Sequence, residues 1–354
     1  MKLSLCMIVK NEESVIARCL KSVSSFADEI IIVDTGSTDR TKEIVSRFTS
    51  KIYDFKWIDD FSAARNFSFS KATGDYIMWL DADDIITPLN AKKILELKNS
   101  YDPKTDIFMF KYNVAFDNNN NPTFTYYRER IIKNSNKYSW ESPIHEVIPL
   151  NGNIIYTDIC VEHRKLKQND PKRNLKIFQK MISNGVVLDA RQQFYYGREL
   201  FYNQEDIAAI NTLEDFLRRN DGWIENKIDA CKLLSTLYLR NFDFDNALLS
   251  LFKSFKFSEP RSNICCDIGK FFFDKKDYKS SIFWYELAST RTLNMASNAF
   301  IEPDTYNYIP FMQLCVIYYR LGDFEKANIY NEMAGKVKPN DSNYLYNRKL
   351  LSNL

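Results

Sequence analysis

The sequence predicts an α/β domain at its N-terminal side and an all-α domain after it. The chain has 354 residues, which is long enough for two domains that each bury a core. Within the first 110 residues, short apolar runs typical of buried strands alternate with segments of helical periodicity. Beyond about residue 170 the strand patterns end and helical patterns continue. We therefore expect the first domain to span residues 1–168 and the second to span 169–354.

The order of elements predicts the α/β domain. Four apolar runs predict strands buried on both faces of a sheet, at 3–9, 29–34, 51–55 and 76–81. Helical periodicity predicts the segments that follow them, at 11–26, 35–48, 60–72 and 88–99. Strands separated by helices of this length indicate parallel βαβ units. Segments 106–117 and 123–134 flank the polar stretch 118–122 and predict a hairpin.

The helical half repeats a short pattern. Four segments carry a small residue at the same register position: Ala209, Ala247, Ser281 and Ala327. The residues four positions later are Leu213, Leu251, Tyr285 and, as the exception to the apolar or aromatic pattern, Asn331. This resembles tetratricopeptide repeats, helix–turn–helix units of about 34 residues that serve most often as interaction scaffolds. The alternative is a helical bundle that only stabilises the first domain.

Composition limits the partners and the compartment. The formal net charge of +2 gives no reason to expect nucleic acid or a charged membrane surface as a partner. The apolar run at the start is too short for a signal peptide, and no window reaches the roughly 18 apolar residues of a membrane span. The seven cysteines are scattered without a CxxC pair, which predicts reduced thiols and a cytoplasmic protein.

Polar residues follow three of the predicted strands, at 10–13, at Asp34 and at 81–84. Ligands of open α/β sheets bind outside the carboxyl ends of the strands, so these residues predict one site. Asp81 and Asp83 are one residue apart, and paired carboxylates suit Mg²⁺ or Mn²⁺. The alternative is that Asp83 or Asp84 only caps the helix that begins near Pro88.

Four motifs in this order, "LCMIVKNEE", "EIIIVDTGSTDRT", "DFSAARN" and "GDYIMWLDADD", resemble the inverting family-2 glycosyltransferases of GT-A fold. The resemblance covers residues 3–90 and implies a nucleoside-diphosphate-sugar donor. By position, it implies nucleotide-sugar contacts at Val9, Asn11, Glu12, Asp34, Arg65, Asp81 and Asp83. It further implies that Asp81 faces the ribose or sugar and that Asp83 binds Mn²⁺ or Mg²⁺.

Two later motifs, "WESPIHE" (140–146) and "VEHRK" (161–165), hold the two histidines of the chain. They resemble a family-2 subgroup with tetratricopeptide-like helices after the catalytic domain, which includes enzymes that glycosylate Cys or Ser of bacteriocin peptides. Many family-2 relatives carry a Glu-Asp pair after the DxD motif as the base, and this chain lacks it. Glu146 is our candidate general base, with His145 as the alternative, and His163 is a candidate third metal ligand.

The sequence thus predicts a metal-dependent inverting enzyme that transfers a hexosyl or N-acetylhexosaminyl group from a UDP-sugar. The expected acceptor is a Ser or Cys side chain of a peptide or protein recognised by the helical domain, because stacked helix pairs form concave binding surfaces. The same helices could instead join two copies into a homodimer. The alternatives are a transferase that acts on a glycan or lipid-linked sugar of the cell envelope, and a non-catalytic repeat scaffold.

Overall fold

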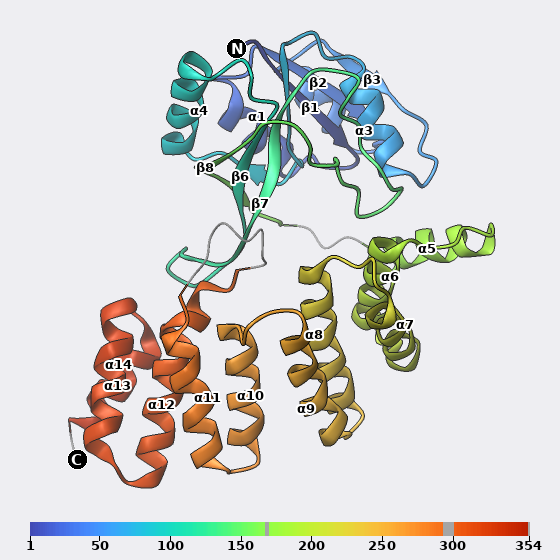
Figure 1. Cartoon of the computed structure of the whole chain (residues 1–354). Coiled ribbons are helices and arrows are strands. Elements are labelled where there is room, and N and C mark those ends of the chain that lie inside the picture. Colours follow the sequence, from blue (N-terminus) through green and yellow to red (C-terminus); the bar gives the residue numbers. More distant parts are fainter. Residues whose placement is uncertain (167–169, 293–300, 353–354) are drawn as a thin grey trace. The chain divides into compact units, whose positions relative to one another are not determined.

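The computed structural model describes residues 1–166, 170–292 and 301–352. The chain forms two compact units, Met1–Val187 and Leu188–Leu354 (Figure 1). The predicted boundary after residue 168 lies outside the described residues and stays a prediction. Helix α5 (Arg173–Ser183) belongs to the first unit, where Lys180 pairs with Asp59 at 2.5 Å and Arg173 lies over the ring of Phe61.

The described part of the first unit contains an eight-stranded sheet in the order β3-β2-β1-β4-β7-β6-β8-β5. The strands are β1 (Leu3–Val9), β2 (Glu29–Asp34), β3 (Ile52–Asp54), β4 (Tyr76–Trp79), β5 (Asp84–Ile85), β6 (Ile107–Phe116), β7 (Pro122–Lys133) and β8 (Ile154–His163). Strands β3, β2, β1 and β4 are parallel, whereas β7 runs antiparallel to both β4 and β6. The predicted parallel strands and the predicted hairpin are therefore both confirmed.

Helices cover both faces of the parallel strands. The helices of this part are α1 (Ile16–Val23), α2 (Thr41–Val45), α3 (Phe61–Phe69) and α4 (Pro88–Ser100). Alternate residues of β1 point to opposite faces, so that Leu3, Leu5 and Met7 pack in one core with α1 and α4. Cys6 lies on the other face, where its thiol donates to the carbonyl of Ser68 in α3 at 3.5 Å.

Thr87 caps α4, which decides one alternative left open by the sequence. Its hydroxyl accepts from the backbone N–H of Asn90 at 3.4 Å, and Pro88 occupies the first helical position. Asp84 lies in β5 instead, three residues before the cap. The alternative that Asp83 or Asp84 caps this helix is therefore wrong, because Thr87 and Pro88 supply the cap.

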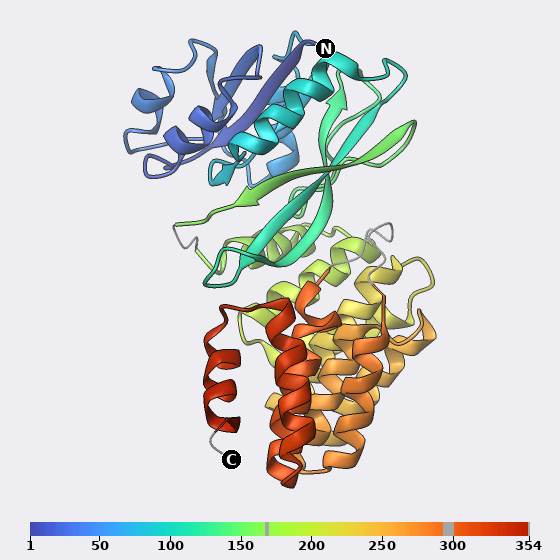
Figure 2. The same cartoon turned by 90° about the vertical axis from the view of Figure 1, so that its left-hand side faces the viewer.

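The second unit is helical throughout its described residues. Its helices are α6 (Ala190–Tyr202), α7 (Asp206–Arg218), α8 (Ile224–Arg240), α9 (Phe244–Lys253), η1 (Ser254–Lys256), α10 (Ser262–Asp274), α11 (Tyr278–Thr290), η3 (Pro303–Tyr306), α12 (Tyr308–Leu321), α13 (Phe324–Val337) and α14 (Ser342–Leu351). Figures 1 and 2 show the paired helices α6/α7, α8/α9, α10/α11 and α12/α13 stacked in chain order. No described helix is long and apolar enough to cross a bilayer.

The predicted repeat register coincides with the contacts inside each helix pair. The four small residues, Ala209, Ala247, Ser281 and Ala327, are all fully buried. The second helix of three pairs begins after an aspartate whose side chain accepts a backbone N–H, at Asp243, Asp277 and Asp323. These caps fix where each second helix starts, and in one pair the Ser281 hydroxyl donates to the carbonyl of Gly269 in the preceding helix at 2.8 Å. The tetratricopeptide-like architecture is therefore confirmed.

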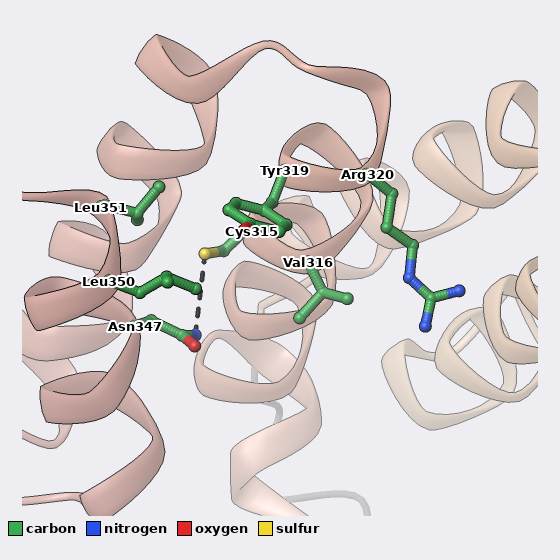
Figure 3. Close-up of a pocket in the computed structure, with 7 residues that line it drawn as sticks. All are labelled: Cys315, Val316, Tyr319, Arg320, Asn347, Leu350 and Leu351. Carbon is green, nitrogen blue, oxygen red and sulfur yellow. Dashed lines mark hydrogen bonds between the residues drawn. The ribbon is translucent and has the colours of Figure 1, made fainter. Parts of the chain in front are cut away.

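The final helix, α14, packs on α12 and α13. Figure 3 shows a small pocket between α12 and α14, lined by Cys315, Val316, Tyr319, Arg320, Asn347, Leu350 and Leu351. The amide of Asn347 approaches the thiol of Cys315 at 3.7 Å. The ring of Tyr344 lies against Gly335 of α13, where no larger residue has room.

All seven cysteines lie in described residues, and none of them forms a disulfide.

Candidate active site

The carboxyl ends of β1, β2 and β4 lie next to one another in the sheet. Val9 pairs with Asp34 in the parallel register of β1 and β2, so the two strands end level. β4 lies on the other side of β1 and ends at Trp79, two residues before Asp81. The three polar strand ends predicted from the sequence therefore share one edge of the sheet.

Asp34 has one carboxylate oxygen in use and one unused. The side chain is 1% exposed, and Oδ1 accepts the backbone N–H groups of Gly36 and Ser37 at 2.9 and 2.8 Å. Gly36 adopts φ +104°, which glycine tolerates best and which lets the loop turn back onto this carboxylate. Oδ2 is buried without a hydrogen-bond partner among the described residues. A buried acceptor without a partner is costly, so Oδ2 suits a donor on a bound ligand.

The loop after β1 is tied to the loop after β2. Asn11 has φ 57°, its Oδ1 accepts from the backbone N–H of Thr38 at 2.7 Å, and its own N–H donates to the Ser37 hydroxyl at 2.9 Å. The backbone N–H of Glu12 donates to the Thr41 hydroxyl at 2.7 Å. These bonds hold Asn11 and Glu12 beside the Asp34 loop, and the Val9 carbonyl accepts from the backbone N–H of Thr35 at 2.9 Å.

Arg65 packs against two neighbouring indole rings and pairs with two carboxylates. It belongs to α3, is 7% exposed, and its guanidinium carbon lies 5.0 Å from the Trp79 ring centre and 4.8 Å from that of Trp140. Nη2 binds Asp81 Oδ1 at 2.8 Å and Nε binds Glu146 Oε1 at 2.7 Å. Trp140 is thus a buried core residue, and Arg65 joins the DxD segment to the "WESPIHE" segment.

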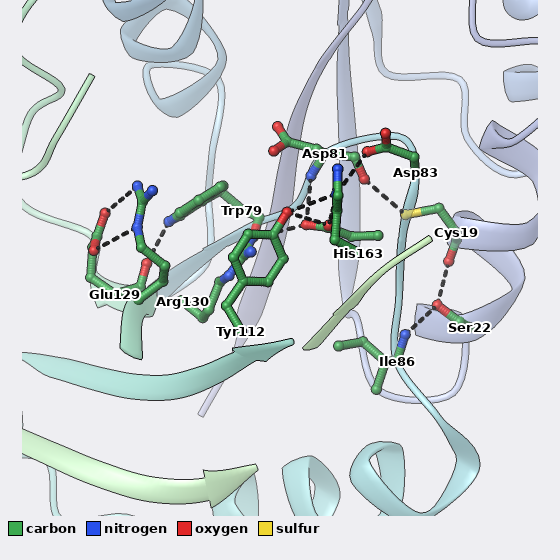
Figure 4. Close-up of polar contacts among 12 residues, drawn as sticks. Cys19, Ser22, Trp79, Asp81, Asp83, Ile86, Tyr112, Glu129, Arg130 and His163 are labelled. Carbon is green, nitrogen blue, oxygen red and sulfur yellow. Dashed lines mark hydrogen bonds and ion pairs between the residues drawn. The ribbon is translucent and has the colours of Figure 1, made fainter. Parts of the chain in front are cut away.

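Asp83, Asp84 and His163 form a group whose ligand atoms lie within 4.8 Å of one another. Asp84 and His163 are direct partners across the antiparallel pair β5 and β8. His163 Nδ1 lies 3.3 Å from Asp83 Oδ1 and 3.2 Å from Asp84 Oδ1 (Figure 4). The backbone N–H of Arg164 donates to the Asp83 carbonyl at 2.9 Å, which fixes the loop against β8. This group brings together the two predicted ligands, Asp83 and His163.

The charges of this group suit a divalent cation. Burial and the neighbouring carboxylates of Asp81 and Asp84 raise the pKa of Asp83, against the opposing effect of His163. Burial also raises the pKa of Asp81, but Arg65 and Arg130 outweigh it and bring that pKa down to about 2. Carboxylate oxygens with one imidazole are a donor set that fits Mn²⁺, and the carboxylates alone fit Mg²⁺. A cation here would offset the repulsion between the carboxylates.

Asp84 connects this group to buried residues of the sheet. Its Oδ1 accepts from the Tyr112 hydroxyl at 2.8 Å, and its Oδ2 lies 3.1 Å from Arg130 Nη1. Asp84 and Arg130 are both fully buried. The sequence analysis did not assign Tyr112 or Arg130 to the site. The available signal was an arginine within the apolar end of a strand, at "RERII", where a buried charge needs a partner.

The two candidate bases lie in the segment between β7 and β8. Glu146 is mostly buried and ion-paired to Arg65, so it lies beside Asp81 through that shared arginine. His145 adopts φ 51° and stacks on Phe178 of α5, with ring centres 6.1 Å apart. The geometry thus holds Glu146 near the DxD segment, and the assignment of the base stays a prediction.

Comparison with known families identifies the domain that carries this geometry. Residues 4–151 match the sequence model of the family described as "Glycosyl transferase family 2". Residues 4–151 are a family-2 glycosyltransferase domain. The family-2 domain contains every predicted site residue except His163, which follows it in β8. Its parallel strands β3-β2-β1-β4, with helices on both faces, agree with the predicted GT-A fold.

Two curated relatives share different lengths of the chain. A TPR repeat-containing protein of Synechococcus elongatus is 36% identical over 148 residues, which are 42% of this chain and 35% of that protein. The SPbeta prophage-derived glycosyltransferase SunS of Bacillus subtilis is 26% identical over 266 residues, 69% of this chain and 60% of SunS. The chain therefore spans about a third and about three fifths of these relatives.

Among solved structures, the chain resembles residues 1–349 of TarS from S. aureus. The TM-score is 0.39 at 17% identity, with 72% of this chain and 90% of that chain covered.

Proposed function

We propose that the chain is a metal-dependent inverting glycosyltransferase that uses a UDP-sugar donor. The observation that supports this most is the group formed by Asp83 and Asp84, which follow β4 in the family-2 domain, and by His163 at the end of β8. A divalent ion bound there would neutralise the charge that develops on the leaving diphosphate. Asp83 and His163 are the proposed ligands.

The nucleoside would bind at the ends of β1 and β2. The unpartnered, buried Oδ2 of Asp34 supports a hydrogen bond from the base or ribose. Val9, Asn11 and Glu12 would form the opposite wall of this pocket, because their loop is bonded to the loop after Asp34. Arg65 and Asp81 would face the ribose and sugar.

The acceptor would lose its proton to Glu146, or to His145 in the alternative assignment. Glu146 is held near the DxD segment by its ion pair with Arg65, which supports its role as the base. We therefore expect Glu146→Gln to lower the turnover number by about 100-fold while UDP binding stays unchanged, since general-base catalysis contributes roughly 10²–10⁴-fold. Near-normal turnover would remove Glu146 from this role, and the same assay on His145→Ala would test the alternative.

The proposed acceptor is a peptide or protein Ser or Cys side chain. Support comes from the resemblance of "WESPIHE" and "VEHRK" to the peptide-glycosylating subgroup and from the tetratricopeptide-like second unit. Helix pairs of this kind offer an extended concave surface to a peptide. A homodimer through the helical unit is the competing use of that surface, and sedimentation of the purified chain would detect it.

The decisive experiment is a screen of UDP-sugars with the purified chain and Mn²⁺, read as release of UDP. We expect UDP release with one sugar class and its loss in Asp83→Ala. Transfer to Ser- or Cys-containing peptides, compared with glycan and lipid-linked acceptors, then identifies the acceptor class. A chain that binds no UDP at all would favour the non-catalytic scaffold instead.

A further inference from the structure

Asp84 belongs to the candidate metal group, but protein donors already occupy both of its oxygens. Oδ1 accepts from the Tyr112 hydroxyl at 2.8 Å and lies 3.2 Å from His163 Nδ1. Oδ2 accepts from the backbone N–H of Asp81 at 3.1 Å and lies 3.1 Å from Arg130 Nη1. A carboxylate has about four acceptor positions, and these contacts use all of them.

The imidazole of His163 is held through one nitrogen. Its Nδ1 lies 2.9 Å from the Tyr112 hydroxyl oxygen, 3.2 Å from Asp84 Oδ1 and 3.3 Å from Asp83 Oδ1, so its N–H faces these three acceptors. Nε2 has no hydrogen-bond partner among the described residues and carries the lone pair when Nδ1 holds the proton. Metal-binding histidines commonly donate their second N–H to a carboxylate in this way, which fixes the orientation of the ring.

Arg130 supplies the charge that a fully buried carboxylate requires. Its guanidinium carbon lies 3.9 Å from the Trp79 ring centre and 4.2 Å from that of Tyr112, so two aromatic faces enclose it. Nη1 also donates to the Trp79 carbonyl at 3.2 Å, at the end of β4. Removing one partner of a buried ion pair leaves an uncompensated charge, so Arg130 holds the Asp84 carboxylate in place.

We propose that Asp84, Tyr112 and Arg130 are positioning residues that hold His163 and the Asp81–Asp83 turn in the geometry that binds the divalent ion. The ion itself would contact Asp83 and His163, and Asp84 would act through them rather than as a ligand. This inference rests on the proposed metal-dependent function. It adds Tyr112 of β6 and Arg130 of β7 to the site and changes the role of Asp84.

Binding of Mn²⁺ tests the proposal without any turnover. The full chain is titrated with Mn²⁺ in the presence of UDP, and free Mn²⁺ is followed by electron paramagnetic resonance. We expect Tyr112→Phe to weaken Mn²⁺ binding by roughly tenfold, since loss of such outer contacts costs about 10–100-fold in metal affinity. Arg130→Met is expected to weaken it further, and Arg130→Lys, which keeps the charge, to restore part of the affinity.

A matched control separates positioning from general stability. Tyr76 is 2% exposed and its hydroxyl donates to the Thr105 carbonyl at 2.7 Å, so Tyr76→Phe also removes one buried hydroxyl from the same sheet. We expect Tyr76→Phe to bind Mn²⁺ like the wild type. Circular dichroism checks that each variant is folded. If Arg130→Met fails to fold, Tyr112→Phe still tests the proposal, because it removes only the hydroxyl group and keeps the aromatic ring.

Three outcomes would overturn the proposal. Folded Tyr112→Phe and Arg130→Met proteins with wild-type Mn²⁺ affinity would show that these residues do not position the site. If Asp84→Asn loses Mn²⁺ binding as completely as Asp83→Ala does, while Tyr112→Phe binds Mn²⁺ like the wild type, then Asp84 is a direct ligand. A wild-type chain that binds UDP but no Mn²⁺ would overturn the metal dependence of the proposed function and this proposal with it. The first two outcomes overturn only this proposal, because the wild type still binds Mn²⁺ in both.

Discussion

Arg65 satisfies two carboxylates with one side chain, and a lysine cannot do the same. The planar guanidinium reaches Asp81 and Glu146 through different nitrogens while it also packs against the neighbouring rings of Trp79 and Trp140. An ammonium is a single point charge without flat faces, so Arg65→Lys loses at least one of the two ion pairs. Each hydrogen bond to a charged group contributes about 1.5–3 kcal/mol.

We therefore expect Arg65→Lys to lower Mn²⁺-dependent UDP release at least tenfold. The control is Arg47→Lys, because Arg47 forms an exposed pair with Glu43 on the surface of the same unit. Steady-state assays of both variants make the comparison. Equal rates in the two variants would show that the bridge between Asp81 and Glu146 has no part in the reaction.

Glu29 gives the first unit a pH-dependent contribution to stability. Its carboxylate pairs with Lys51 and accepts from the backbone N–H of Thr73 at 2.9 Å. Burial alone would raise its pKa, but these partners and the Ser4 hydroxyl bring the pKa from 4.5 to about 2. Because the folded pKa lies below the unfolded one, the stabilisation is present above pH 4.5 and is lost as the pH falls towards 2.

Glu29→Gln should therefore cost about 3 kcal/mol at pH 7 and progressively less below pH 4.5. Urea unfolding of wild type and variant between pH 3 and 7 measures the difference in free energy of unfolding. Glu43→Gln serves as the control, because its pair with Arg47 is exposed. A difference for Glu29→Gln that stays constant across this range would contradict the assignment.

The sequence predicts the residues of the site better than the ion pairs and hydrogen bonds between them. The DxD spacing and the two histidines pointed to Asp81, Asp83 and His163, and the structure brings Asp83 and His163 together. The ion pair between Arg65 and Glu146 joins residues far apart in the chain, and no local pattern encodes it. The sequence left a cap at Asp83 or Asp84 open as an alternative, although Thr87 and Pro88 already provided a complete cap signal.

At the scale of elements, long apolar runs were predictable and short pairings were not. The parallel strands were readable because strands buried on both faces have no polar alternation to obscure them. β5 has two residues, which is too few for any periodicity, and it exists because it pairs with β8. The parallel pairing of β8 with β6 likewise depends on contacts between distant segments.

The docking of α14 depends on a glycine in α13. A Cβ atom at Gly335 would overlap the ring of Tyr344, which is buried against it. We expect Gly335→Ala to lower the free energy of unfolding of the helical unit by about 1–3 kcal/mol, as overpacking does elsewhere. Chemical denaturation monitored by circular dichroism measures it.

The same substitution in a Tyr344→Ala background tests the cause. Without the ring, the added methyl group has space, and alanine favours the helix over glycine by up to about 1 kcal/mol. Gly335→Ala should then be neutral or stabilising. If Gly335→Ala lowers the free energy of unfolding as much as in the wild-type background, the destabilisation arises within α13 itself rather than in its contact with α14.

At the scale of the whole molecule, the chain combines two units with separate cores. The donor and metal residues of the proposed function all belong to Met1–Val187, and the repeats all belong to Leu188–Leu354. Units that fold on separate cores unfold in separate steps, so a single free energy of unfolding does not describe the chain. A ligand of one unit stabilises only the step in which that unit unfolds.

Differential scanning calorimetry of the full chain should therefore show two transitions. UDP with Mn²⁺ at 100 times the dissociation constant adds about 2.7 kcal/mol to the unit that binds it, which raises one transition by roughly 5–10 °C. Asp83→Ala should abolish this shift, and Gly335→Ala should lower only the other transition. One cooperative transition that responds to both changes would instead mean that the two units stabilise each other, and acceptor binding at the repeats would then be coupled to donor binding.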